Sequence, residues 1–140
     1  MAEISTKKIL DGITRALRSE FPKQQIFDDE IRQGLSPGAF NVILVNASQQ
    51  QIVGERYRRI PLFDVLYYPK CGREECLEIA DRLSLLLNVI SLPEGDLIRG
   101  TGLEFEIIDG ILHFYVRYAH YILRTTEEET MDNLKLIQGG

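Results

Sequence analysis

Two histidines, His113 and His120, are the first candidates for chemistry, because imidazole binds metals and transfers protons near neutral pH. Both lie in one segment of β-branched and aromatic residues, seven positions apart. Side chains alternate between the faces of a regular strand, so an odd spacing puts the two rings on opposite faces. The sequence therefore disfavours a two-histidine metal site. It favours a cross-strand hydrogen bond between His113 and Glu106.

Carboxylates form two further candidate groups. Asp28, Asp29 and Glu30 could bind a cation, and a solvated acidic loop explains them as well. Glu104 and Glu106 share one face of a predicted strand, as catalytic carboxylates do, but the sequence fixes no nucleophile or other acid beside them. No phosphate loop, nucleophile elbow or zinc-protease motif occurs. We predict no enzyme, metal site or cofactor, with a small cation-dependent binding protein or enzyme as the alternative.

A basic and aromatic segment, Gly-Glu-Arg-Tyr-Arg-Arg, occupies residues 54–59 between two predicted strands. Arginine and tyrosine are enriched at protein interfaces, because each offers a large contact area with polar ends. A solvated hairpin tip is the alternative, and nucleic-acid contact would need more basic residues. The segment predicts a protein contact at Arg56, Tyr57, Arg58 and Arg59.

The composition fits one soluble domain. A chain of 140 residues can bury a hydrophobic core without disulfides or metals. The net charge of −5 argues against binding to nucleic acid or an anionic membrane. We find no signal-peptide pattern and no apolar run of about 18 residues, so we expect the protein to stay inside the cell that makes it. Cys71 and Cys76 lack a second cysteine pair, which predicts reduced thiols.

Apolar residues at a spacing of three to four predict two helices. The first runs from Ser5 to Glu20, with Ser5 or Thr6 as N-cap and Phe21-Pro22 as its end. The second runs from about Arg73 to Asn88, and glutamates in its first turn suit the helix dipole. Its predicted apolar stripe contains Cys76, Leu77, Ala80, Leu83, Leu86 and Leu87.

Strands are predicted around these helices at residues 25–27, 39–47, 60–68 and 97–99, with a loop at 33–38. A polar stretch at 48–51 leads from the second of these strands to the arginine and tyrosine segment. Residues 39–47 suit a central strand covered on both faces. Pro61 cannot donate a hydrogen bond, so the strand 60–68 should lie at an edge there or begin after it. Gly100 and Gly102 predict a bulge or sharp bend.

Residues 103–124 predict a β-hairpin, because Asp109-Gly110 favours a two-residue turn between β-rich runs. This turn pairs Ile108 with Ile111 and, further along, Leu103 with Val116. Alternation then gives an apolar face made of Leu103, Phe105, Ile107, Leu112, Phe114 and Val116. The opposite face is a candidate assembly surface made of Glu104, Glu106, His113, Tyr115 and Arg117.

Residues 125–140 lose the apolar periodicity and predict an extended acidic C-terminal arm. Such an arm cannot bury Met131, Leu134 and Leu136 by itself, so we expect these residues to lie on another subunit. The whole pattern predicts an α+β fold. We expect residues 1–124 to form one domain with a mostly antiparallel β-sheet and two helices packed on one face.

Several segments together resemble a known family. They are the Phe-Pro helix end, Gly-Leu-Ser-Pro-Gly-Ala-Phe before a strand, Gly-Glu-Arg-Tyr-Arg-Arg, Leu97-Ile98-Arg99-Gly100-Thr101, Ile108-Asp109-Gly110-Ile111-Leu112-His113-Phe114 and the Glu127-Glu128-Glu129 tail. This combination resembles the tail terminator (tail completion) proteins of tailed phages, prophages and phage-tail-like particles of Gram-positive bacteria.

The resemblance implies a structural virion protein made in the host cytoplasm. Such proteins form a ring, typically a hexamer, on the head-proximal end of the tail tube. The ring stops tube polymerisation and offers a joining surface to the head. The implied partners are further copies of the chain, the tail tube protein and a head-completion or connector protein. A monomeric head–tail adaptor is the other interpretation that remains open.

Overall fold

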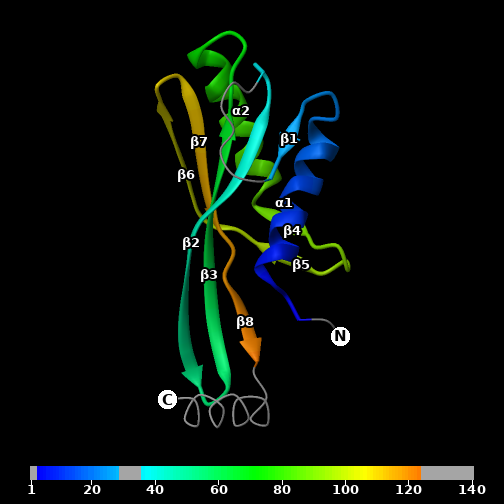
Figure 1. The fold of residues 1–140 in the computed structure, drawn as a ribbon, viewed down its shortest axis with the longest axis vertical. Helices are drawn as coiled ribbons and strands as arrows, with labels where there is room; N and C mark the ends of the chain where they lie inside the picture. The colour runs from blue at the N-terminus through cyan, green and yellow to red at the C-terminus, as the bar shows by residue number, and fades with distance from the viewer. Residues whose placement is uncertain (1–2, 29–35, 124–140) are drawn as a thin grey trace, which may run out of the picture.

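The computed structural model describes residues 3–28 and 36–123. Within these residues, two helices and eight strands follow each other (Figure 1). In order they are α1 (Thr6–Glu20), β1 (Ile26–Phe27), β2 (Phe40–Val53), β3 (Arg56–Tyr67), α2 (Arg73–Leu86), β4 (Val89–Ser91), β5 (Leu97–Arg99), β6 (Thr101–Ile108), β7 (Ile111–Arg117) and β8 (His120–Leu123).

The main sheet has the strand order β1-β2-β3-β7-β6, and β8 pairs with β3 beyond the end of β7. Among the described strands of this sheet, only the β1–β2 pair is parallel, and the other pairs are antiparallel. β4 and β5 form a separate antiparallel pair. The predicted α+β class with a mostly antiparallel sheet is therefore confirmed.

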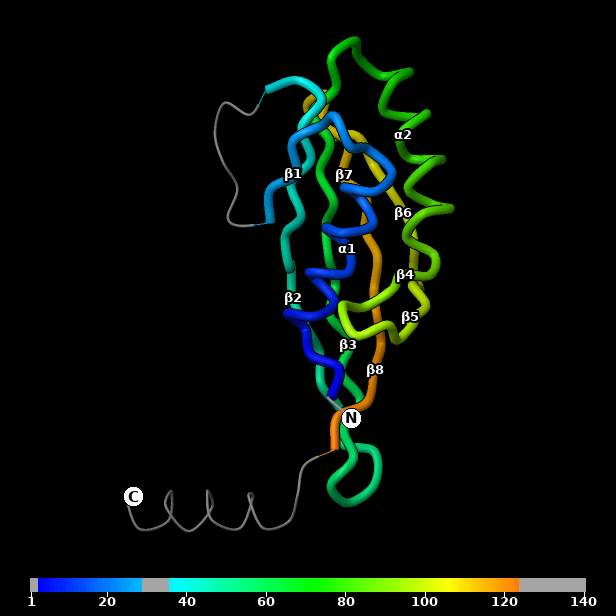
Figure 2. The backbone as a smooth tube through the Cα atoms, turned by 90° about the vertical axis from the view of Figure 1, so that its right-hand side faces the viewer, coloured from blue at the N-terminus to red at the C-terminus, as the bar shows by residue number. Residues whose placement is uncertain are grey.

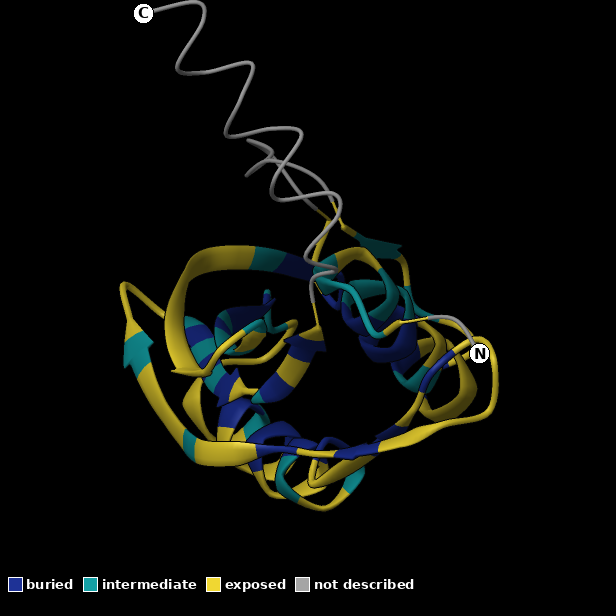
Figure 3. Cartoon of the chain, turned by 90° about the horizontal axis from the view of Figure 1, so that it is seen from below, coloured by how far each residue is buried: buried dark blue, intermediate teal, exposed yellow. Residues whose placement is uncertain are grey.

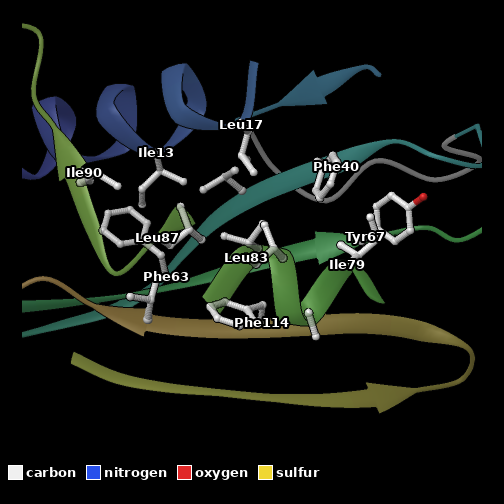
Figure 4. Packing of buried hydrophobic residues seen from close by; sticks show 14 of the residues in the cluster. Ile13, Leu17, Phe40, Phe63, Tyr67, Ile79, Leu83, Leu87, Ile90 and Phe114 are labelled. Carbon is white, nitrogen blue, oxygen red and sulfur yellow. The ribbon is translucent and has the colours of Figure 1, made fainter. Parts of the chain in front are cut away.

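Both helices pack on one face of this sheet, as predicted. Buried side chains on α1, such as Ile13 and Leu17, and on α2, such as Leu83, meet Phe63 and Phe114 from the strands (Figure 4). All five side chains are fully buried. A core of this size supplies the main favourable free energy of folding, which scales with the apolar area removed from water.

α1 begins and ends as its sequence predicts. The Ser5 hydroxyl accepts a hydrogen bond from the Lys8 N–H at 3.2 Å, which satisfies an amide that the helix leaves unpaired. Gly12 is costly in the middle of a helix, and the structure gives a reason for it. A Cβ atom there would lie 3.1 Å from the Ser91 carbonyl oxygen, so glycine lets α1 approach β4 closely.

α2 has a different kind of N-terminus, because its N-cap residue is Gly72. The Glu75 carboxylate instead accepts hydrogen bonds from the N–H groups of Lys70 at 3.0 Å and Cys71 at 2.9 Å. The predicted apolar stripe needs one correction. Leu77 is 41% exposed and Ile79 is buried in its place, because α2 turns Ile79 towards the sheet.

The β6–β7 hairpin confirms the two-residue turn. Asp109 and Gly110 have φ values of 51° and 78°, and the pairs from Ile108 with Ile111 to Glu104 with Tyr115 form in the predicted register. The Leu103–Val116 pair is absent from the register, because a bulge between Thr101 and Glu104 shifts it. The predicted bend at the glycines is this bulge.

The apolar face of the hairpin is buried mainly on one strand. Leu112, Phe114 and Val116 of β7 are fully buried, whereas Phe105 of β6 is 42% exposed and Leu103 and Ile107 are half-buried. β6 is the outermost strand of the sheet, so the core covers it less completely than β7. The prediction of six equivalent core residues was therefore wrong for β6.

β2 is longer than predicted and is buried only at its beginning. The polar stretch 48–51, which follows the predicted strand, continues β2, and every residue from Leu44 to Val53 is exposed. The end of the β2–β3 hairpin projects beyond the N-terminal end of α1, out of reach of the helices (Figure 2). Seen from this end, the projecting strands have long exposed stretches (Figure 3). The expected strand covered on both faces is therefore confirmed at Phe40–Val42 and wrong from Leu44 onward.

Pro61 lies in the central strand β3, although the sequence predicted an edge or a strand start. β7 pairs with β3 from Leu62 onward and β8 pairs with Arg56–Arg59, so Pro61 falls where β3 changes partner. Its carbonyl accepts a hydrogen bond from the Tyr118 N–H at 3.2 Å. A proline is tolerated here because the sheet requires no N–H donor at this break.

Candidate assembly surface

Side-chain alternation along β3 separates the two faces of the main sheet. Phe63, Val65 and Tyr67 face the helices and are buried, whereas Arg56 and Arg58 have the opposite parity and face away from them. The face opposite the helices is called the outer face below. By register it also carries Asp64, Glu104, Glu106, His113, Tyr115, Arg117, Tyr121 and Leu123.

The outer face joins residues of two groups that the sequence predicted separately, the arginine and tyrosine segment and the polar face of the hairpin. The β3–β7 and β6–β7 registers bring the predicted hairpin surface to the same face as Arg56 and Arg58. Glu104, Glu106 and Arg117 are exposed on this face. His113 and Tyr115 are half-buried, and among the described residues no helix covers this face. The division into a core face and a second face holds.

The four-residue arginine and tyrosine group is divided between the faces. Tyr57 and Arg59 lie on the helix side, where Arg59 donates from Nε and Nη2 to Gln49 Oε1 at 3.0 and 2.8 Å. Arg56 and Arg58 remain on the outer face. The group also lies within β3 instead of in a loop between strands, so alternation necessarily splits it.

Opposite charges occupy different ends of the outer face. Glu104 and Glu106 lie on β6, and Arg56 and Arg58 lie near the tip of the projecting hairpin. Glu106 accepts a hydrogen bond from the Tyr115 hydroxyl at 2.8 Å. Burial, together with this bond to Glu106, raises the pKa of Tyr115 to about 12. The Tyr115 hydroxyl therefore stays protonated and holds the Glu106 carboxylate in place.

The partner of His113 is Asp64, and the predicted pair with Glu106 was wrong. His113 Nδ1 lies 2.7 Å from Asp64 Oδ2, and the two side chains are 19% and 11% exposed. Burial raises the pKa of Asp64, and the hydrogen bond to His113 opposes that shift. Glu106 is directly across from His113 in the register, but Asp64 lies diagonally on β3 and is more buried. Only the pairing of β3 with β7 creates this contact.

His120 has a structural position that the sequence did not indicate. It lies on β8, separated from β7 by a break at residues 118–119, so it does not share a strand with His113. The ring is 4% exposed, and its Nδ1 lies 3.1 Å from the Tyr118 carbonyl oxygen, which requires Nδ1 to donate. Burial lowers the pKa of His120, and the nearby Arg59 charge acts in the same direction. The folded state therefore favours the neutral ring.

This shift predicts a loss of stability in mild acid. The unfolded chain binds a proton at His120 at about pH 6.5, whereas the folded chain resists it, so stability is full above that pH and falls as pH decreases below it. We expect the free energy of unfolding, measured with urea, to fall less between pH 7.5 and 5.5 in His120→Asn than in the unchanged chain. Asp64, whose raised pKa acts in the opposite direction, is common to both chains. Equal pH dependence in the two chains would contradict this assignment.

The described residues offer little for metal or thiol chemistry. Within residues 3–28 and 36–123, no group of three or more His, Cys, Asp or Glu side chains is placed to hold a metal ion. Cys71 is exposed, Cys76 is buried, and both are free thiols. Asp29 and Glu30 lie outside the described residues, as do Met131, Leu134 and Leu136 of the predicted arm.

One feature of this surface was missed in the sequence. Ile52, Val53 and Leu123 are exposed apolar residues that line a shallow groove with Glu55 and Arg56 at the tip of the projecting hairpin. Nearby, the Arg56 guanidinium lies 6.0 Å from the centre of the Tyr121 ring. Exposed apolar groups beside arginine and tyrosine are typical of protein interfaces. The sequence offered one signal for this exposed apolar group, which is the pair Ile52-Val53 directly after the polar residues 48–51.

Most of the chain matches a known protein family. Residues 8–130 match the family described as phage tail terminator protein. The chain belongs to this family. No curated protein matches it. Terminators are structural proteins of the phage tail, so this chain acts in tail assembly, resides in the virion tail and contacts other tail components. Among the described residues of this terminator, neither helix is long and apolar enough to cross a membrane.

Proposed function

We propose that this terminator forms a ring of identical subunits, typically six, on the head-proximal end of the tail tube. The ring ends tube polymerisation and provides the surface to which the head-completion or connector protein binds. The role is structural and involves no catalysis, cofactor or direct nucleic-acid recognition. The similarity to terminators of Gram-positive phages, prophages and phage-tail-like particles extends the proposal to a particle of that kind.

The observation that carries this proposal is the outer face, which places basic and acidic ends on one surface that neither described helix covers. Different patches on one subunit can bind each other in a head-to-tail manner, and such contacts close into a ring when the rotation between subunits permits. The interface residues proposed from the sequence on this face are Arg56, Arg58, Glu104, Glu106, His113, Tyr115 and Arg117. Tyr57 and Arg59 lie on the helix side, so we assign them a supporting role.

Residues 125–140 extend the proposal to an arm that contacts a neighbouring subunit. Leu123, the last residue described, lies beside Arg56 near the tip of the projecting hairpin, so the segment starts at an exposed end of the sheet. In this arrangement Met131, Leu134 and Leu136 are buried against the next copy of the chain. Residues 1–124 then form the single folded domain.

The test is to add the purified terminator to its tail tube protein during polymerisation. Tubes are expected to become shorter as the ratio of terminator to tube protein rises, with a ring at one end in negative-stain electron microscopy. Native mass spectrometry of capped ends gives the number of subunits. Tubes that grow to the same length with and without the terminator would contradict capping. One bound monomer per tube end would favour the adaptor instead.

A further inference from the structure

The β2 strand has an open edge that carries neither charged residues nor proline. β1 pairs only with Phe40 and Asn41, and no other described strand lies on that side of β2. The sequence from Phe40 to Val53 contains no charged residue, proline or glycine. Long exposed edges are normally blocked by charges, prolines or bulges, because unpaired N–H and C=O groups bind further strands. Two bulges flank the run Asn46–Gln51, which itself is regular and exposed.

The opposite edge of the same sheet, formed by β6, is also open among the described strands. β6 pairs only with β7 among the described strands. In a two-residue hairpin the pair next to the turn, Ile108 and Ile111, exchanges hydrogen bonds, and every second pair does the same. The backbone groups of Glu106 therefore point towards β7, while those of Phe105 and Ile107 point away from the sheet. Phe105 and Ile108 are 42% and 43% exposed.

The strand directions make these two edges compatible. β2 is antiparallel to β3, β3 to β7 and β7 to β6, so β2 and β6 run in opposite directions. Suppose that β6 of a second copy lies beside β2 and that the outer faces of both copies point to the same side. The new strand pair is then antiparallel. The regular run Asn46–Gln51 and the segment Leu103–Ile108 each provide six residues.

Charges on the outer face favour this pairing over others. Glu104 and Glu106 of the second copy would lie beside Ser48 and Gln50, whose hydroxyl and amide groups donate hydrogen bonds. Arg58, directly across from Gln50 on β3, is on the same face. β2 itself adds no carboxylate that would repel the two glutamates. Like charges directly across a strand pair are destabilising, and opposite charges are favourable.

We propose that the run Asn46–Gln51 of one subunit pairs with Leu103–Ile108 of a second copy, which extends the sheet from subunit to subunit. This contact deepens the proposed ring and rests on its self-assembly. The two edges differ, so the contact is head-to-tail and leaves one free β2 and one free β6 edge until the ring closes. Pairing of β2 with β2, or with a strand of another tail protein, is an outcome that the test separates.

Cross-linking between two chains that each carry one exposed cysteine, with Cys76 left buried, tests the pairing. In a Cys71→Ser background, the variants Ser48→Cys and Glu106→Cys are mixed and treated with a short bismaleimide. The reaction is run in solution at protein concentrations up to the millimolar range, and also with the protein bound to tube ends. We expect a dimer that contains one chain of each kind. Glu78→Cys, exposed on α2, serves as the matched control in place of either variant. A product of Ser48→Cys with itself alone, or a yield no higher than the control, overturns the proposal.

Charge substitution at the edge gives an independent readout. Ser48→Glu is expected to raise the concentration for half-maximal assembly by about tenfold, because each ring subunit would place this carboxylate beside two glutamates. Ser48→Lys should assemble at least as well as the unchanged chain, and Glu104→Lys with Glu106→Lys should restore Ser48→Glu. Equal effects of Glu and Lys at position 48 overturn the contact. Specific cross-links with unaltered tube length would instead contradict tube capping while leaving this subunit contact intact.

Discussion

Particles assembled with Arg56→Glu and Arg58→Glu are expected to have longer tails of irregular length and to yield few infectious particles. Both side chains lie on the outer face near the tip of the projecting hairpin, and Arg56 is exposed. Reversing two charges removes attraction to carboxylates on a partner and adds repulsion, which together cost several kcal/mol at a close interface. The measurement is the tail-length distribution by electron microscopy after complementation of a terminator deletion.

The matched control carries the same change in charge on the helix side of the molecule. Arg15 on α1 and Arg99 on β5 are exposed, and Arg15→Glu with Arg99→Glu should leave tail length unchanged. Circular dichroism and thermal unfolding show whether both double variants are folded. Tails of normal length with Arg56→Glu and Arg58→Glu, in a folded protein, would remove these arginines from the interface.

The second large effect is expected in the core, where Phe114→Ala should lower the free energy of unfolding by about 3–5 kcal/mol. Phe114 is fully buried between the sheet and α2, so the substitution removes apolar burial and leaves a cavity. Urea unfolding followed by circular dichroism measures this loss. A cost below about 1 kcal/mol would mean that the hairpin does not form the core described above.

Phe105→Ala is the natural comparison, because Phe105 lies directly across from Phe114 on β6. The two rings stack with centroids 6.5 Å apart and planes 7° from parallel, but Phe105 is 42% exposed. Its removal should therefore cost only the stacking contact and partial burial, about 1 kcal/mol. Under the proposed strand pairing, this variant should weaken subunit assembly more than it weakens folding.

Local features of this chain were predictable from the sequence. Ser5 caps α1, Phe21 ends it, and Asp109-Gly110 sets the register of β6 and β7. Each of these depends on residues within a few positions of each other, where backbone preferences and side-chain spacing act directly. The α+β class follows from the same signals, because two amphipathic helices among β-rich segments need a common sheet to cover.

Contacts between distant segments were not predictable in the same way. Asp64 and His113 are 49 positions apart, and their pair depends on how β3 aligns with β7. The same alignment brings Arg56 and Arg58 to the face that carries Glu104 and Glu106. A strand displaced by one residue would turn each of these side chains to the other face.

By itself, the sequence determined the helices, the tight hairpin and the chemical types of residue on its two faces, because those depend on local backbone geometry and period. Only the tertiary structure decided that β2 and β3 project past the helices, that β8 is separate from β7, and that one outer face joins the predicted contact groups. The physical reason is that sheet register and burial arise from pairing between remote strands, whose alignment is set by the packing of the whole core.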